Sequence, residues 1–289
     1  MRYGIGVALV VAAAVSWSLT GLAIRQIGTP DPWAILFWRS VGVLPVLGAV
    51  IFWNRGGFLA PMRQAGLPGV FGGLSLVFAF SGAIYALQAT TVANAMFLFA
   101  ASPFIAAALG WAVLGERVHP LTWACMGVAI AGMFVMVREG LSVGAGPGNV
   151  AALLSATGFA CFTLTLRWGK LSDMMPATFL GGVFSAIAAA VVTRASGGTL
   201  LMPVHDIGIS LFMGAILLAA GLTLYTFGSK ALRAADLTLL SNIEVLLGPV
   251  WVWIFVGETA GTATLLGGLV LLAAVVANGL IGLRHAAVA

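Results

Sequence analysis

Long apolar stretches recur along almost the whole chain, and they limit its fold more than any other feature of the sequence. A helix that crosses a bilayer needs about 20 predominantly apolar residues. Such stretches lie at residues 4–24, 33–53, 67–87, 93–114, 119–137, 149–167, 175–194, 207–228, 237–256 and 261–282. The sequence therefore predicts an all-α polytopic membrane protein with ten transmembrane helices.

Ten spans leave little of the chain for anything else. They use roughly 200 of the 289 residues, and only 7% of all residues are charged. The Gly169-Lys170 pair is followed by leucine and lacks the earlier glycine of a phosphate-binding loop. We therefore exclude an ATPase cassette, and any energy for the function must come from gradients. The first apolar run has no cleavage pattern after it, so we expect a retained helix.

The formal net charge of +5 does not indicate a nucleic-acid partner, because the basic residues stand singly between apolar helices and form no basic face. They indicate topology instead. With the N-terminus inside, the inner side receives Arg2, Arg55, Arg63, Arg117, Arg167, Lys170, Lys230, Arg233 and Arg284, and the outer side Arg25, Arg138 and Arg194. This excess predicts that both termini are cytoplasmic, in a bacterial inner membrane.

The two halves of the chain repeat one another weakly. Trp17 precedes Arg25 by eight residues, as Phe159 precedes Arg167. The segments ALQA (86–89) and ALRA (231–234) each precede a span that closes on Gly-Glu, at 115–116 and 257–258. Five helices is an odd number, so the second copy enters the membrane from the opposite side. We expect two inverted five-helix repeats, residues 1–143 and 144–289, around a central cavity, as is typical of secondary transporters.

The segments ALRAADLTLLSNIEVLLGPVWVWIFVGE (231–258) and ALQATTVANAMFLFAASPFIAAALGWAVLGE (86–116) resemble the EamA branch of the drug/metabolite transporter superfamily. The resemblance covers nearly the whole chain. It implies ten helices around a central cavity and the export of small metabolites. Within this branch, YddG-like amino-acid exporters are the preferred comparison.

Glu244 lies within an apolar run, about 10 Å from the start of its span. A carboxylate there costs roughly 3 kcal/mol on insertion scales and usually faces a cavity or a partner. The nearby polar residues Thr238, Ser241 and Asn242 gather on adjoining faces of the same helix. We interpret Glu244 as a cavity acid, with a helix-bridging hydrogen bond as the alternative.

Arg39 is the other charge within a span. It can reach outward, bind a substrate carboxylate, or pair with Glu244 or Glu258. We favour a structural or gating role. The remaining candidates for lining the cavity carry hydroxyl, amide or amphipathic aromatic groups: Trp17, Thr20, Tyr85, Asn94 and Tyr225. For the aromatic residues, contact with lipid is an equal alternative.

The leading hypothesis is a secondary transporter that exports small metabolites, most simply amino acids, by alternating access. One alternative is the efflux of hydrophobic cationic drugs, coupled to protons through Glu244. A remote alternative, an intramembrane enzyme, is disfavoured because no span carries a hydrolase motif or an acid pair for a metal. We expect no cofactor and no metal, and a small-molecule substrate and the lipid bilayer as partners. Proton coupling and the choice between monomer and dimer stay open.

Overall fold

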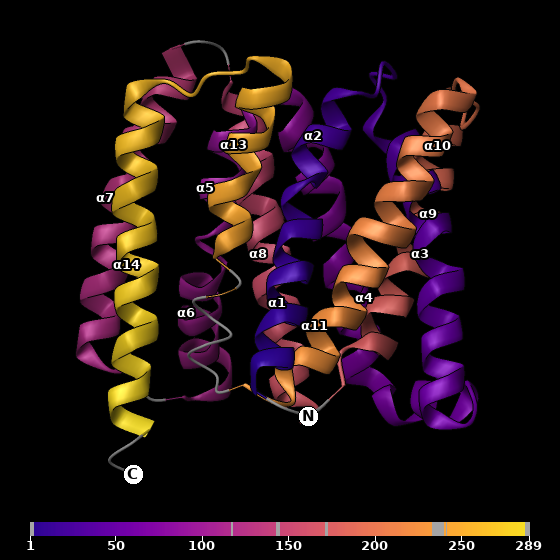
Figure 1. The fold of residues 1–289 in the computed structure, drawn as a ribbon, viewed down its shortest axis with the longest axis horizontal. Helices are drawn as coiled ribbons and strands as arrows, with labels where there is room; N and C mark the ends of the chain where they lie inside the picture. Colours follow the sequence, from indigo (N-terminus) through magenta and orange to yellow (C-terminus); the bar gives the residue numbers. More distant parts are fainter. Residues whose placement is uncertain are drawn as a thin grey trace.

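The computed structural model describes residues 3–116, 118–142, 145–170, 173–232, 240 and 242–286, without the side chains of Arg55, 139–142 and 281–286. All regular structure within these ranges is helical (Figure 1). The helices are α1 Tyr3–Ser18, α2 Thr20–Arg25, α3 Pro32–Arg55, α4 Leu59–Ala89, α5 Val92–Phe99, α6 Ser102–Leu114, α7 Pro120–Ser142, α8 Gly146–Trp168, α9 Met175–Ala195, α10 Val204–Phe212, the π-helix η1 Met213–Ala220, α11 Gly221–Ser229, α13 Ile243–Val256 and α14 Thr262–Ala286.

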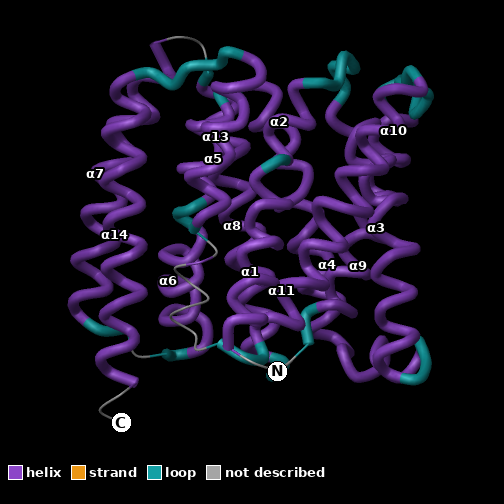
Figure 2. The backbone as a smooth tube through the Cα atoms, viewed as in Figure 1, coloured by secondary structure: helices purple, strands orange, loops and turns teal. Residues whose placement is uncertain are grey.

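These helices confirm a polytopic membrane protein. In the described ranges, nine helical segments are long and apolar enough to cross a bilayer, and Ile243–Val256 is a shorter apolar helix. The first span consists of α1 and α2, the fourth of α5 and α6, and the eighth of α10, η1 and α11. Figure 2 shows that the connections between spans are short loops at the two ends of the bundle.

The ends of the helices follow from local chemistry. Gly56, Gly115 and Gly257 have φ values of 64°, 68° and 73°, and each ends a helix in the left-handed conformation that glycine adopts most easily. Gly66, at φ 52° and ψ −150°, separates a short first segment of α4 from the part that spans the bundle. The latter begins where the sequence predicted the third span to begin.

Two faces of the bundle are used as reference below. The N-terminal face is the one at which α1 begins, and it also carries Glu116 and Ser229; the opposite face carries Arg25 and Glu258 (Figure 1). Between these faces α4 packs on α8 and α9, α3 packs on α9 and η1, and α1 packs on α11 and α13. The pair of α7 and α14 stands at one edge.

Helix contacts at the centre are close because glycines allow them. A Cβ added to Gly214 in η1 would collide with the backbone carbonyl of Arg39 in α3. One added to Gly42 in α3 would collide with the carbonyl of Leu211 at the end of α10. Small residues at such crossings are how helices approach one another in lipid. These two glycines therefore fix the second span against the eighth.

Candidate functional site

Glu244 lies in the first turn of α13, whose described part starts near mid-height of the bundle (Figure 1). The side chain is partly exposed within a strongly apolar helix. Its carboxylate has no hydrogen-bond or ion-pair partner among the described residues. A carboxylate at the N-terminal end of a helix interacts favourably with the helix dipole. This position lowers the cost of a charge in the membrane and leaves the acid open to a ligand or a proton.

Trp17, in the second half of the first span, and Tyr225, four residues before the end of the eighth span, come together. Their ring centroids are 5.5 Å apart with the planes tilted by 41°. Gly221 lies against the indole of Trp17, because an added Cβ would stand 2.6 Å from Nε1. That buried Nε1 has no hydrogen-bond partner within the described part of the chain. The pair presents flat apolar surface together with two polar atoms.

The first span is interrupted beside this pair. α1 ends at Ser18 and α2 begins at Thr20, a partly exposed residue of the candidate set. The hydroxyl of Ser18 donates to the carbonyl of Val15 at 2.7 Å and accepts the indole N–H of Trp251 at 2.9 Å. Since Trp251 lies two turns beyond Glu244 in α13, the first, eighth and ninth spans meet at one place.

Asn94 and Tyr85 have other surroundings. Asn94 is 2% exposed, and its side-chain amide donates to Thr90 Oγ1 at 3.0 Å and to Asn149 Oδ1. It thus joins α5 to α8. Tyr85 is 41% exposed on α4. In the structure these two side chains contact neither Trp17 nor Tyr225.

Of the polar residues placed around Glu244, Thr238 and Ser241 lie outside the described residues. Asn242 is the N-cap residue of α13, and its carbonyl accepts the N–H of Val245 at 3.2 Å. Asn242 has a further interaction with its surroundings.

Arg39 is 7% exposed, and its guanidinium carbon lies 4.7 Å from the ring centroid of Phe80. This cation–π contact supplies a favourable environment for a buried charge. Its Nε has no hydrogen-bond partner within the described ranges. The carboxylate of Glu258, one of the partners considered from the sequence, is bound to another arginine.

That arginine is Arg25, the last residue of α2. Its Nε donates to Glu258 Oε2 at 2.6 Å, and its other nitrogens donate to the carbonyls of Leu87 and Thr90. Glu258 Oε1 also accepts the N–H of Val92 at 2.6 Å. The side chains are only 20% and 17% exposed. This ion pair ties the first, third, fourth and ninth spans together at the opposite face.

A matching ion pair lies at the N-terminal face. Arg167 Nη1 donates to Glu116 Oε2 at 2.6 Å, and Nη2 donates to the carbonyl of Ala106 at 2.9 Å. This pair joins the fourth and sixth spans and is more exposed, at 38% and 36%.

Sequence reasoning used these four residues only as landmarks of repetition and topology. In that alignment Arg25 corresponds to Arg167, and Glu258 corresponds to Glu116. This correspondence is the signal that could have predicted the ion pairs. The arginine and the glutamate of one pair occupy the same positions in the repeat as the arginine and the glutamate of the other.

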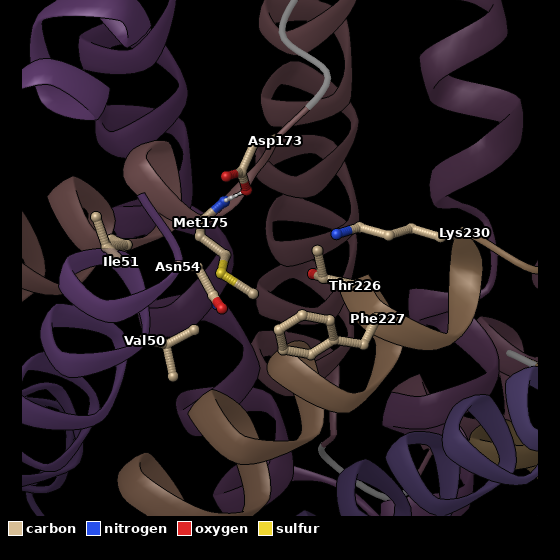
Figure 3. A pocket seen from close by; sticks show the side chains of 8 residues that line it. All are labelled: Val50, Ile51, Asn54, Asp173, Met175, Thr226, Phe227 and Lys230. Atoms are coloured by element: carbon tan, nitrogen blue, oxygen red, sulfur yellow. Dashed lines mark hydrogen bonds between the residues drawn. The ribbon is translucent and has the colours of Figure 1, made fainter. Parts of the chain in front are cut away.

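A cavity of about 270 Å³ lies at the N-terminal face, between the ends of α3, α9 and α11 (Figure 3). Its lining residues are Val50, Ile51, Asn54, Asp173, Met175, Thr226, Phe227 and Lys230. Of the polar groups of the eighth span that the sequence offers for lining a cavity, Thr226 lies here, whereas Glu244, Trp17 and Tyr225 do not line this cavity. From the sequence, Lys230 was interpreted only as a determinant of topology.

The fold and these contacts agree with what comparison with known proteins shows. Residues 4–138 match the EamA-like transporter family. The match covers slightly less than half of the chain, and this part is similar to that family. The resemblance noted in segment 86–116 is thereby confirmed.

Similar proteins extend the match over both halves of the chain. The pseudopaline exporter CntI of Pseudomonas aeruginosa is 26% identical over 94% of this chain and 95% of its own length. Protein RarD of Streptomyces exfoliatus is 26% identical over 77% of this chain and 71% of its own. The uncharacterized transporter YwfM of Bacillus subtilis is 28% identical over 57% of each. The family and the named transporters among these relatives indicate transport rather than enzymatic catalysis.

A solved crystal structure shares the fold. It aligns with a TM-score of 0.68 over 96% of this chain and 98% of that chain, at 18% sequence identity. At this identity the likeness concerns the arrangement of helices alone.

Proposed function

We propose that the chain is a secondary transporter that exports small metabolites, with amino acids as the leading class, by alternating access. The observation that carries this proposal is the pair of matched ion pairs, Arg25–Glu258 and Arg167–Glu116, at opposite faces of the bundle. A transporter of this kind must close one face while the other opens. Each ion pair closes one face.

The proposal includes two inverted repeats, residues 1–143 and 144–289. In each ion pair, an arginine from the first helix of one repeat meets a glutamate at the end of the fourth helix of the other repeat. The helix contacts have the same reciprocity: α1 packs on α11 as α8 packs on α4. This exchange supports the inverted relationship. From the distribution of basic residues, the proposal also includes an inner membrane with both termini cytoplasmic.

Breaks in the central helices support a binding site near mid-depth. The first span is interrupted between Ser18 and Thr20, and the fourth between Phe99 and Ser102. Discontinuous helices line substrate sites in inverted-repeat transporters because their ends present unpaired backbone groups. The Trp17–Tyr225 pair and Glu244 belong to this region.

The substrate class follows from these groups. Glu244 offers a carboxylate for an ammonium group, and the aromatic pair offers a surface for an apolar side chain. An amino acid carries both features. Export is supported by the name of CntI, a pseudopaline exporter. The closer comparison with YddG-like exporters stays a prediction.

A second candidate is the efflux of hydrophobic cations coupled to protons. It is favoured by one observation, the Glu244 carboxylate that has no partner in the described part of the chain. Such an acid can hold a lipophilic cation or a proton, and nearby Trp17 can add a cation–π contact.

The test is counterflow into proteoliposomes, with amino acids and lipophilic cations as substrates, for the parent and for Glu244→Gln. We expect amino acids to exchange in the parent and the variant to lose most of this exchange. The control is Asp31→Asn, which also removes a carboxylate. Asp31 caps α3 by accepting the N–H of Trp33 at 2.9 Å, and asparagine caps helices equally well.

Exchange of cations alone would replace the leading proposal with the second candidate. Equal exchange of amino acids by parent and Glu244→Gln would remove Glu244 from the site. Transport that is the same with and without a pH gradient would remove proton coupling. Gel filtration of each variant shows whether a loss of transport reflects a loss of fold.

A further inference from the structure

The cavity at the N-terminal face contains charged and polar groups that the transport proposal does not use. Three structural elements contribute to it: the end of α3, the start of α9 with the residue two before it, and the end of α11 (Figure 3). Asn54 and Lys230 are exposed, so the cavity opens at this face. Its volume of about 270 Å³ is enough for a small organic molecule or for the end of a larger one.

Lys230 supplies a cation to this cavity. Its ammonium lies 5.1 Å from the ring centroid of Phe227, and among the described residues it has no hydrogen bond and no ion pair. Three N–H donors are therefore directed into the cavity without an acceptor from the described chain.

Two neutral polar residues, Asn54 and Thr226, also line the cavity (Figure 3). The side-chain amide of Asn54 makes no hydrogen bond among the described residues. The hydroxyl of Thr226 donates to the carbonyl of Leu222 at 2.8 Å and keeps its lone pairs as acceptors. The ammonium of Lys230 and the side-chain amide of Asn54 together form a set of donors for one anionic group.

The rest of the cavity limits what else a ligand carries. Val50, Ile51, Met175 and Phe227 form an apolar wall. The carboxylate of Asp173 accepts the N–H of Met175 at 3.0 Å and has a further interaction. Because this carboxylate repels additional negative charge, the cavity suits a ligand with a single negative charge rather than two.

We infer that this cavity binds a molecule in which one singly charged anionic group, a carboxylate or a phosphodiester, is attached to an apolar body. Lys230 and Asn54 hold the anion, and Phe227 and Met175 contact the apolar part. Two sources provide this chemistry: a soluble carboxylate from the compartment at this face, or the headgroup of a bilayer lipid. The inference concerns binding alone, so it does not depend on the transport proposal.

The sequence provides a direct reporter, because Lys170 and Lys230 are its two lysines. Reductive methylation with carbon-13 labels both and keeps their positive charge, and their resonances are then followed by NMR. Lys170 is exposed at the same face and does not line the cavity. It is therefore an internal control for non-specific effects of added ligand.

The full chain is placed in phosphatidylcholine nanodiscs and titrated with 3-phenylpropionate, or with phenethylamine as the matched cation. In a second arm, phosphatidylglycerol replaces part of the lipid. A saturable shift of the Lys230 resonance with 3-phenylpropionate, and none with phenethylamine, indicates a soluble carboxylate. A shift with phosphatidylglycerol alone indicates a lipid headgroup. If neither moves the Lys230 resonance, or if both lysines move together, the inference is wrong.

Asn54→Ala keeps the reporter and removes the amide. We expect the midpoint of the titration to rise about threefold or more, as for the loss of one hydrogen bond to a charged ligand. Gln64→Ala, at an exposed residue of the same face outside the cavity, is the control and should leave the midpoint unchanged. An unchanged midpoint for Asn54→Ala would overturn the assignment of Asn54.

Discussion

At the scale of single residues, the contacts decide what each polar group does. Glu244 and Asn94 are both polar residues near the start of an apolar helix, in the ninth and fourth spans. Asn94 is buried and bonded to Asn149, whereas Glu244 is partly exposed and has no partner in the described ranges. The same kind of sequence signal therefore marks a helix-bridging residue in one case and, in the other, a partly exposed acid that we propose as a site residue.

The Asn94–Asn149 contact gives a prediction about stability. Asn94→Leu leaves the buried amide of Asn149 without its partner, so we expect a loss of about 0.5–2 kcal/mol. The double variant Asn94→Leu with Asn149→Leu removes both polar groups and should recover part of this loss. Thermal unfolding of the protein in detergent measures both. Strictly additive losses would show that the contact contributes nothing.

Sequence reasoning identified polar residues at this scale but could not assign partners. Arg25 and Glu258 are separated by 233 residues, and no local pattern states that their side chains meet. From the sequence, Glu116 and Glu258 were recognised as the closing residues of two corresponding spans. The structure places each against an arginine, and Glu258 also accepts the N–H of Val92 in α5.

At the scale of helices, the bounds predicted from the sequence agreed better with the structure than the contacts of single residues did. The bilayer requires a certain apolar length, and the described helices follow the ten apolar stretches with small shifts at their ends. The interruptions within spans were not foreseen. The π-helix η1 has the sequence MGAILLAA, which contains no proline, and its one glycine, Gly214, does not by itself predict a π-helix. Its close contact with α3 depends on how the two helices pack, which cannot be predicted from the sequence of η1 alone.

The contact of η1 with α3 gives a prediction at this scale. Gly214→Ala places a methyl group against the backbone carbonyl of Arg39, so we expect a loss of about 1–3 kcal/mol. Gly208→Ala is the control in the same span, because no atom lies within 4 Å of its added Cβ. Thermal unfolding compares the two variants. Equal melting temperatures would contradict the close crossing.

At the scale of the whole molecule, the two ion pairs should oppose one another. Glu258→Gln weakens closure of the opposite face, and Glu116→Gln weakens closure of the N-terminal face. The pair at the N-terminal face is well exposed and contributes little, about 0.2–1 kcal/mol, whereas the more buried pair contributes more. We therefore expect Glu258→Gln to have the larger effect.

Buried reporters measure this effect. In a background without Cys125 and Cys161, Val92→Cys reports beside Glu258 and Ala106→Cys reports beside Arg167. We expect maleimide labelling to rise about tenfold at the first reporter in Glu258→Gln and about two- to fivefold at the second in Glu116→Gln. The double substitution Arg25→Glu with Glu258→Arg exchanges the two charges and should restore slow labelling at the Val92→Cys reporter. If either substitution increases labelling of both reporters equally, the two ion pairs do not close their faces independently.

The whole-molecule plan is also where the sequence was most informative about function. Repetition of short segments predicted an inverted pair of five-helix units, which stays a prediction, and the similarity of residues 4–138 to the EamA-like transporter family supports a transporter. The substrate was not predictable to the same degree. In the proposed site it depends on side chains such as Trp17 and Glu244, and the relative positions of these residues arise only when distant spans pack together.

The reciprocity of the ion pairs also affects how the protein is made. Arg25 leaves the ribosome 233 residues before Glu258, and Glu116 leaves 51 residues before Arg167. When the first half of the chain enters the membrane, Arg25 and Glu116 therefore both lack their ion-pair partners. The chain gains one of these partners when the sixth span arrives and the other only when the ninth span has ended. A chain that stops before the ninth span has ended therefore keeps Arg25 without the carboxylate of Glu258.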